Sequence, residues 1–244
     1  MKNNQTLIFI PTYNEKENIE KIYSKITELK LNIDILFLDD NSPDGTGILL
    51  DRLVKAYHNV KVIHRPKKLG IGSAHLAGIK WAYDYKYQKL ITMDCDFTHS
   101  PEYLYDFIKH SDNYDVVIGS RYILKESLKG WNPVRKFLTL SGHILTKYLL
   151  KLPYDASGAY RLYRLDKIPQ DIFNFIYSSG YSFFFESLYL LNINGFFIKE
   201  IPIVLPPRTY GHSKMSIIDI FHSVKYLFRT YLQNSINKDK FKIS

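Results

Sequence analysis

Three short polar clusters, each directly after an apolar run, contain the residues of this chain that are best suited to chemistry. They are Pro11–Glu15, Asp39–Gly45 and Asp94–Asp96. Asn, Asp, Ser, Pro and Gly are also ordinary turn and cap residues, so a single cluster of this kind would say little about function. Three such clusters, each at the end of an apolar run, favour one shared site over three unrelated turns.

Asp94 and Asp96 have the spacing of a metal-binding pair. On an extended chain residues two apart project to the same side, where two ionised carboxylates repel each other and call for a cation. Mg²⁺ and Mn²⁺ take one or two protein carboxylates and complete their coordination shells with water and substrate phosphates. The pair therefore predicts Mg²⁺ or Mn²⁺ bound with a nucleotide diphosphate, where the metal acts as a Lewis acid for the departing diphosphate.

The second half of the chain carries most of the positive charge. The formal net charge of the 244 residues is +9, of which residues 1–120 contribute −1 and residues 121–244 contribute +10. Residues 121–151 hold seven basic residues and one acidic residue. This asymmetry predicts an anionic partner near that segment, or else a solvated basic face. Arg208 and Lys214 flank a Tyr-Gly turn and could close on a ligand as a mobile loop.

Short β-branched and aromatic runs alternate with helical patterns over the first 120 residues, which is typical of βαβ units and a largely parallel sheet. We expect strands at Thr6–Ile10, Ile33–Leu38, Val60–His64, Leu90–Met93 and Val116–Gly119. We expect helices at Glu15–Leu29, Gly45–Tyr57, Ser73–Tyr85 and Pro101–His110. Ligands bind beyond the carboxyl ends of parallel strands, and the three polar clusters fall at such ends.

The sequence of the second half, residues 121–244, predicts a less regular series of helices and strands. We expect helices at Val134–Leu150, at Ser182–Leu191 and from about Ser216, and extended segments at Ala159–Arg164 and Phe197–Val204. The last helix has apolar residues at three- and four-residue steps, so it either packs on the core or lies on a membrane surface. No apolar run reaches the ~18 residues of a membrane-spanning helix.

The chain is predicted to form one α/β domain, because no linker or repeat interrupts it. We assign residues 1–215 to a catalytic domain and residues 216–244 to a C-terminal amphipathic helix and tail. Cys95 is the single cysteine and the N-terminus is not typical of a signal peptide, which predicts a reducing, cytoplasmic setting.

Two other enzyme classes fit the order of the motifs less well. Residues 91–98 have the form of the nucleophile motif of haloacid-dehalogenase-like phosphatases, in which Asp94 would form an acyl phosphate. In those enzymes the motif follows the first strand, whereas four predicted elements precede it here. A Rossmann dehydrogenase is disfavoured because the turn after the first strand lacks a Gly-rich phosphate loop.

Taken in order, the motifs of this chain resemble those of family 2 glycosyltransferases, and most closely the polyprenyl- or dolichyl-phosphate mannosyltransferases. The resemblance extends from about Thr6 to Ser216. Its segments are Pro11–Ile19, Asp39–Thr46, Lys68–Gly72, Met93–Pro101, Gly119–Tyr122, Gly158–Arg164 and Tyr210–Met215. It implies a glycosyltransferase-A fold, which is a mostly parallel, Rossmann-like sheet between layers of helices.

The resemblance also implies a role for each matching position. The nucleoside contacts would fall on Pro11, Tyr13, Glu15 and Asp40. The sugar diphosphate and its metal would be held by Asp94, Cys95 and Asp96, with the two aspartates as metal ligands and Asp96 as a catalytic residue. Arg208 and Lys214 would close on the diphosphate, while Arg121 and Arg135 would engage an acceptor lipid phosphate.

The implied reaction transfers a hexose, preferably mannose from GDP-mannose, to polyprenyl phosphate at the inner face of the membrane, with peripheral membrane contact and no nucleic acid partner. A phosphate acceptor needs no general base. A saccharide hydroxyl would need one, for which Asp155 and Glu186 are candidates, so a UDP-hexose donor with a saccharide acceptor stays open. The chain departs from the mannosyltransferase pattern at Thr98, Pro207, Phe184 and residues 123–130.

Overall fold

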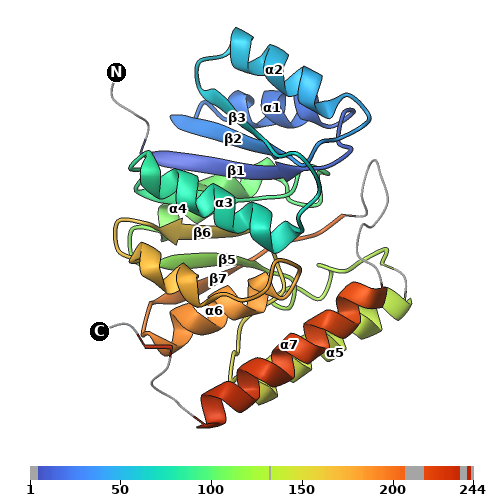
Figure 1. Cartoon of the computed structure of the whole chain (residues 1–244), viewed down its shortest axis with the longest axis vertical. Coiled ribbons are helices and arrows are strands. Elements are labelled where there is room, and N and C mark those ends of the chain that lie inside the picture. Colours follow the sequence, from blue (N-terminus) through green and yellow to red (C-terminus); the bar gives the residue numbers. More distant parts are fainter. Residues whose placement is uncertain (1–4, 132, 207–216, 237–240, 243–244) are drawn as a thin grey trace.

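The computed structural model describes residues 5–131, 133–206, 217–236 and 241–242, and it has one seven-stranded sheet (Figure 1). The strand order is β3-β2-β1-β4-β6-β5-β7. The strands are β1 (Thr6–Thr12), β2 (Ile33–Asp39), β3 (Val60–His64), β4 (Lys89–Thr92), β5 (Val116–Ser120), β6 (Arg161–Arg164) and β7 (Ile198–Pro202). All are parallel except β6, which pairs antiparallel with both β4 and β5.

Helices cover both faces of the sheet. The α-helices are α1 (Ile19–Glu28), α2 (Thr46–Ala56), α3 (Ile71–Asp84), α4 (Leu104–His110), α5 (Pro133–Leu149), α6 (Phe183–Ile193) and α7 (Ile217–Ile236). Two short 3₁₀ helices are η1 (Pro101–Tyr103) and η2 (Gln170–Phe175). The predicted mostly parallel sheet between helical layers is confirmed.

The two cores follow from the alternation of side chains along β1. Leu7 and Phe9 face the layer that contains α3 and α6, whereas Ile8 and Ile10 face the layer of α1, α2 and α4. All four are fully buried. A parallel strand that is covered on both faces requires an apolar run without polar alternation, and this run is what identifies β1 in the sequence.

The strands of the first half match their expected positions to within two residues, but α1 does not. We predicted a helix from Glu15, and it begins at Ile19. The backbone N–H groups of Asn14, Glu15 and Lys16 donate instead to side chains of residues 42–46, which holds this segment as a turn. η2 was not predicted from the sequence, and the two extended segments of the second half are shorter than predicted.

Helices α5 and α7 lie side by side at one end of the molecule, beyond α6 (Figure 1). The predicted helix from about Ser216 therefore exists, although the boundary at residue 215 falls outside the described residues. Among the described helices, none has the length and apolar character that crossing a membrane requires.

Candidate active site

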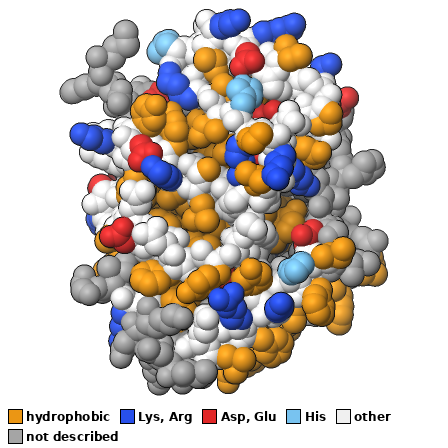
Figure 2. Space-filling view, viewed as in Figure 1, with side chains coloured by type: hydrophobic (Ala, Val, Ile, Leu, Met, Phe, Trp, Pro, Cys, Tyr) orange, Lys and Arg blue, Asp and Glu red, His pale blue; other side chains and the backbone are white. Residues whose placement is uncertain are grey.

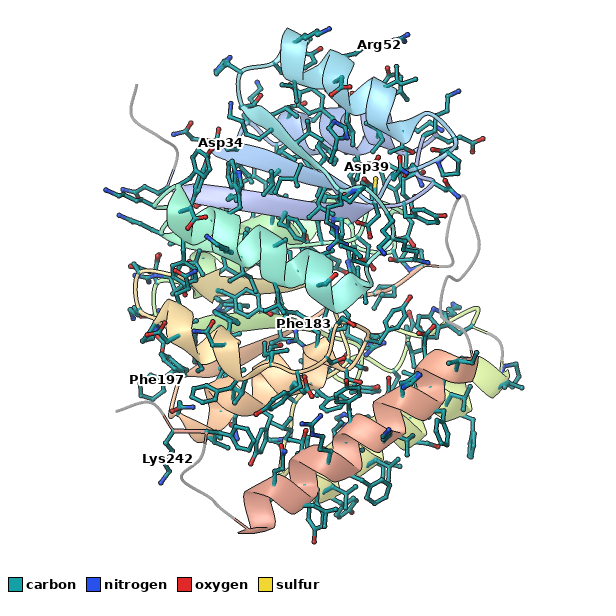
Figure 3. The ribbon with its side chains drawn as sticks, viewed as in Figure 1. Asp34, Asp39, Arg52, Phe183, Phe197 and Lys242 are labelled. Atoms are coloured by element: carbon teal, nitrogen blue, oxygen red, sulfur yellow. The ribbon has the colours of Figure 1, made fainter. Side chains whose placement is uncertain are left out.

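The carboxyl ends of β1, β2 and β4 meet at one edge of the sheet and bring the three polar clusters together. The backbone N–H of Asp40 donates to the carbonyl of Thr12 at 3.2 Å, and that of Met93 donates to the carbonyl of Phe9 at 3.1 Å. Figure 3 shows Asp39 at the carboxyl end of β2, beside the end of β1. The clusters therefore lie at one edge of the sheet, as expected for the ends of parallel strands. A shared binding site at this edge stays a prediction.

The turn that contains Tyr13 and Glu15 is fastened to the loop after β2. The N–H of Glu15 donates to Oγ1 of Thr46 at 3.0 Å, and the N–H of Lys16 donates to Oδ2 of Asp44 at 3.1 Å. Burial alone would raise the pKa of Asp44, but hydrogen bonds from Thr46 and Lys16 lower it. The Asp44 carboxylate thus stays ionised, and its hydrogen bond from Lys16 holds the predicted nucleoside-binding turn against the loop after β2.

Asp40 is held by a residue that the sequence analysis missed. Arg65, directly after β3, forms an ion pair with both carboxylate oxygens of Asp40, with Nη2 at 2.7 Å from Oδ2. Its Nη1 also donates to Oγ of Ser73, in the first turn of α3, at 2.8 Å. An arginine directly after a strand of a parallel sheet is the signal that could have identified it. The ion pair fixes the orientation of the Asp40 carboxylate and neutralises its charge.

The Lys68–Gly72 segment packs closely enough to place a cation at this edge. Nζ of Lys68 lies 4.9 Å from the centre of the Tyr13 ring. Gly70 has a φ of +96°, and a Cβ on it would lie 2.4 Å from the carbonyl oxygen of Ser179. Only glycine fits this conformation and this contact, which explains the glycine that precedes α3.

The Asp94–Asp96 segment does not continue the strand: β4 ends at Thr92, and a series of bends follows over residues 95–99. Asp96 is 4% exposed, and its Oδ1 accepts from the N–H of Thr98 at 3.1 Å and from its Oγ1 at 2.6 Å. Asp94 is more exposed, at 33% of its side chain. Cys95 lies with its side chain in the core, so a ligand would contact its backbone.

The Mg²⁺ or Mn²⁺ expected at Asp94 and Asp96 stays a prediction. The described part of the chain has no group of three or more His, Cys, Asp or Glu side chains that could form an all-protein metal site. Mg²⁺ and Mn²⁺ do not need one when a diphosphate supplies the remaining oxygens. Hydrogen bonds from Thr98 orient the carboxylate of Asp96 in advance, as the supporting contacts of metal ligands do.

Arg121 is engaged in a buried ion pair at the end of β5. Its Nε and Nη2 donate to the two carboxylate oxygens of Asp155 at 2.7 and 2.6 Å, and Asp155 is fully buried. Burial alone would lower the pKa of Arg121 and raise that of Asp155, but their mutual attraction shifts both in the opposite direction. Arg121 therefore stays charged, and only the edge of its guanidinium that faces away from Asp155 can meet a phosphate.

The other predicted basic residues are only partly described. Arg135 lies in the first turn of α5, but its side chain is outside the described structure. Arg208 and Lys214 lie outside the described residues altogether. Their phosphate-binding roles therefore stay predictions.

Neither candidate general base is well placed for that role. Asp155 is committed to Arg121, and the N–H of Asp155 itself donates to Oε1 of Glu200 at 2.6 Å. Glu186 is 5% exposed, and its Oε2 accepts from the backbone of Tyr177 and Ser178. Burial raises the pKa of Glu186 to about 7, against those hydrogen bonds. Both carboxylates stabilise the surrounding structure.

Comparison with known proteins agrees with this geometry. The chain matches the family described as Glycosyl transferase family 2 over residues 7–170. It is 37% identical over 215 residues to a polyprenol monophosphomannose synthase of Mycolicibacterium smegmatis, covering 87% of this chain and 81% of the relative. It is 34% identical over 213 residues to an undecaprenyl-phosphate mannosyltransferase of Micrococcus luteus, covering 87% and 88%.

Solved structures agree on the fold. Residues 1–349 of S. aureus TarS in complex with UDP-GlcNAc superpose with a TM-score of 0.60 at 17% identity, covering 94% of this chain and 66% of that one. The mannosyltransferase PcManGT from Pyrobaculum calidifontis, in complex with GDP-Man and Mn²⁺, gives 0.52 at 15% identity, covering 95% and 72%. From the match over most of its length and the two close relatives, the chain is an enzyme that belongs to glycosyltransferase family 2.

Proposed function

We propose that this glycosyltransferase moves mannose from GDP-mannose to polyprenyl phosphate and depends on Mg²⁺ or Mn²⁺. The observation that carries the proposal is the single sheet edge at which β1, β2 and β4 end, directly before the segments that contain Tyr13, Asp40, Asp94 and Asp96. The names of both relatives, and the GDP-Man and Mn²⁺ bound to PcManGT, support the donor, the metal and the acceptor.

The donor binds with its nucleoside against the Tyr13 turn and its diphosphate beside Asp94 and Asp96. The Arg65 ion pair holds Asp40 at the nucleoside, and Thr98 orients Asp96 toward the diphosphate. A divalent cation, when bound, offsets the charge that develops on the departing diphosphate. Arg208 and Lys214, which lie outside the described residues, are proposed to contribute positive charge to the binding of the diphosphate.

The acceptor phosphate attacks C1 of mannose on the face opposite the diphosphate. As the new C1–O bond forms, the bond from C1 to the β-phosphate oxygen breaks and its electron pair leaves with GDP. The anomeric carbon inverts, and the product is a β-linked polyprenyl phosphomannose. A phosphate monoester already carries its oxyanion, so positioning and charge balance by Arg121 and Arg135 suffice.

The state of the two candidate bases supports a phosphate acceptor over a saccharide hydroxyl. Asp155 is fully buried in its ion pair with Arg121, and Glu186 is buried under hydrogen bonds from the 177–178 backbone. A hydroxyl acceptor would require one of them to leave these contacts. The saccharide-acceptor alternative, with a UDP-hexose donor, therefore becomes an outcome of the test.

The test is transfer of radiolabel from GDP-mannose, and in parallel from UDP-glucose, with polyprenyl phosphate and Mn²⁺. We expect organic-extractable label from GDP-mannose alone, and its loss when a chelator is added. Label from UDP-glucose would contradict the donor. Chelator-sensitive donor hydrolysis without any lipid-linked label would contradict the acceptor and favour a saccharide.

We further propose that the enzyme acts as a peripheral protein on the inner face of the cytoplasmic membrane, and that α5 and α7 together form its docking face. This face, the α5–α7 face, consists of apolar side chains that are 38–75% exposed. They are Val134, Phe137, Leu138, Leu140, Ile144 and Tyr148 of α5, and Ile218, Phe221, Val224, Phe228, Tyr231 and Leu232 of α7. Figure 2 shows hydrophobic side chains along these helices at the lower right.

The apolar stripe of the last helix is therefore divided between the body and the surface. Leu227 and Thr230 are buried against the body, whereas Phe221 and Phe228 on the same helix are exposed. Two exposed lysines lie on the same helices, Lys147 on α5 and Lys225 on α7. Exposed apolar area together with lysines matches an anionic bilayer surface, where each lysine contributes about 1 kcal/mol.

Two substitutions on this face, Phe137→Ser and Phe221→Ser, are expected to release the enzyme from vesicles. Each Phe contributes about 1.5–3 kcal/mol when fully buried, so the double variant should partition at least about tenfold less. The measurement is flotation with phosphatidylcholine–phosphatidylglycerol vesicles. The matched control is Phe197→Ser, because Phe197 is 70% exposed but lies outside the face (Figure 3). Equal flotation of the double variant and the control would contradict the proposal.

A further inference from the structure

His99 lies directly behind the predicted metal-binding aspartates and was given no role by the sequence. It is 4% exposed, and its Nδ1 accepts the backbone N–H of Asp94 at 2.9 Å. The same Nδ1 lies 3.7 Å from Oδ2 of Asp94. Because Nδ1 accepts this hydrogen bond, the ring carries its proton on Nε2.

The ring of His99 is itself held in place by Tyr160. The two rings stack with centroids 4.9 Å apart and an interplanar angle of 29°. The hydroxyl of Tyr160 donates to the carbonyl of Ser100 at 3.0 Å, and its ring packs on Phe107 of α4 at 4.4 Å. His99 therefore connects the backbone of Asp94 to Tyr160, directly before β6, and through Tyr160 to Phe107 of α4.

The bend needs such a support because it has no regular structure of its own. β4 ends at Thr92, and Phe97 adopts a φ of +62°, so the chain from 93 to 100 is shaped by side-chain contacts. Thr98 orients Asp96 by hydrogen bonds. His99 performs the corresponding task for the backbone of Asp94.

We propose that His99 is a positioning residue: through Nδ1 it fixes the bend at Asp94, and thereby the direction in which the Asp94 carboxylate meets the metal–diphosphate. The inference deepens the proposed function and rests on it for the identity of the ligand. Contacts that orient metal ligands typically affect metal affinity 10- to 100-fold when they are removed. A histidine that merely fills the core would instead be replaceable by phenylalanine.

The chain supplies a matched control in His75. This second histidine is fully buried and stacks on Phe183 at 5.2 Å, yet neither of its ring nitrogens has a hydrogen-bond partner in the described part of the structure. Burial lowers its pKa to about 3, so it is a neutral aromatic filler. His75→Phe should therefore leave the aspartate bend unchanged.

The experiment compares the wild type with His99→Phe, His99→Asn, His99→Gln and His75→Phe. The first readout is amide hydrogen exchange at Asp94 in the metal-free enzyme, and the second is Mn²⁺ affinity in the presence of GDP, measured by calorimetry. We expect His99→Phe to lose protection at Asp94 and to bind Mn²⁺ at least about tenfold more weakly. Asn places an acceptor where Nδ1 lies and should restore both properties, whereas Gln should not.

The two readouts separate this inference from the function on which it rests. If His99→Phe keeps wild-type protection at Asp94 or wild-type Mn²⁺ affinity, or if His75→Phe shows the same losses, His99 is not a positioning residue. If wild-type enzyme binds no Mn²⁺ with GDP, the proposed donor site fails. The exchange measurement in the metal-free enzyme then still decides whether His99 holds the bend.

Discussion

Asp96→Asn is expected to lower the rate of sugar transfer at saturating Mn²⁺ by about 10³-fold. A bound divalent cation contributes several kcal/mol to stabilising the departing diphosphate, and about 4 kcal/mol corresponds to that factor. Asn keeps an oxygen that can accept from the N–H and Oγ1 of Thr98, so the bend around residue 96 should survive. The measurement is the initial rate of lipid-linked label formation, together with Mn²⁺ affinity in the presence of GDP.

Asp112→Asn is the matched control for this loss. Asp112 is 72% exposed and pairs with Lys89, which begins β4, so it lies at the opposite end of the strand from Asp96. This variant should transfer sugar at the wild-type rate. Full activity of Asp96→Asn would exclude Asp96 as a metal ligand and a catalytic residue.

Asp155→Asn is expected to destabilise the fold by about 3–5 kcal/mol, the largest stability effect that the structure predicts. Arg121 would be left charged in a site where its side chain is 11% exposed, and removing one partner of a buried pair leaves an uncompensated charge. The measurement is the free energy of unfolding in urea.

Asp84→Asn is the control for the charge itself. Asp84 pairs with Lys80 at 2.6 Å, but both side chains are at least half exposed, so the variant should cost less than about 1 kcal/mol. Equal destabilisation by the two substitutions would contradict the buried-pair argument. Arg121→Ala is a poor probe of the acceptor site, because this substitution would leave the Asp155 carboxylate buried and unpaired. Arg135 is the better position for that purpose.

The local pattern of the sequence was sufficient to predict the sheet of the first half and the edge at which the three polar clusters lie. Strands that are covered on both faces need unbroken apolar runs. A run such as Leu7–Ile10 therefore predicts a buried strand even when the strands that pair with it are unknown. Polar residues that end such runs must lie at one edge of a parallel sheet, which is why the segments that contain Asp40 and Asp94 were expected at the same edge, where the structure has them.

Contacts between distant residues lay beyond the reach of the same reasoning. The start of α1 at Ile19 and the Arg65–Asp40 and Arg121–Asp155 ion pairs each depend on groups that only the folded chain brings together. Arg121 and Asp155, for example, are 34 residues apart.

The amphipathic pattern of the last helix shows the same limit. The sequence by itself determined that residues 217–236 form a helix with an apolar stripe, because helical periodicity is a local property. Only the tertiary structure decided that Leu227 packs on the body while Phe221 and Phe228 join α5 in an exposed face. Periodicity fixes which side chains share a side of a helix, whereas the surface that covers them is set by the packing of the whole chain.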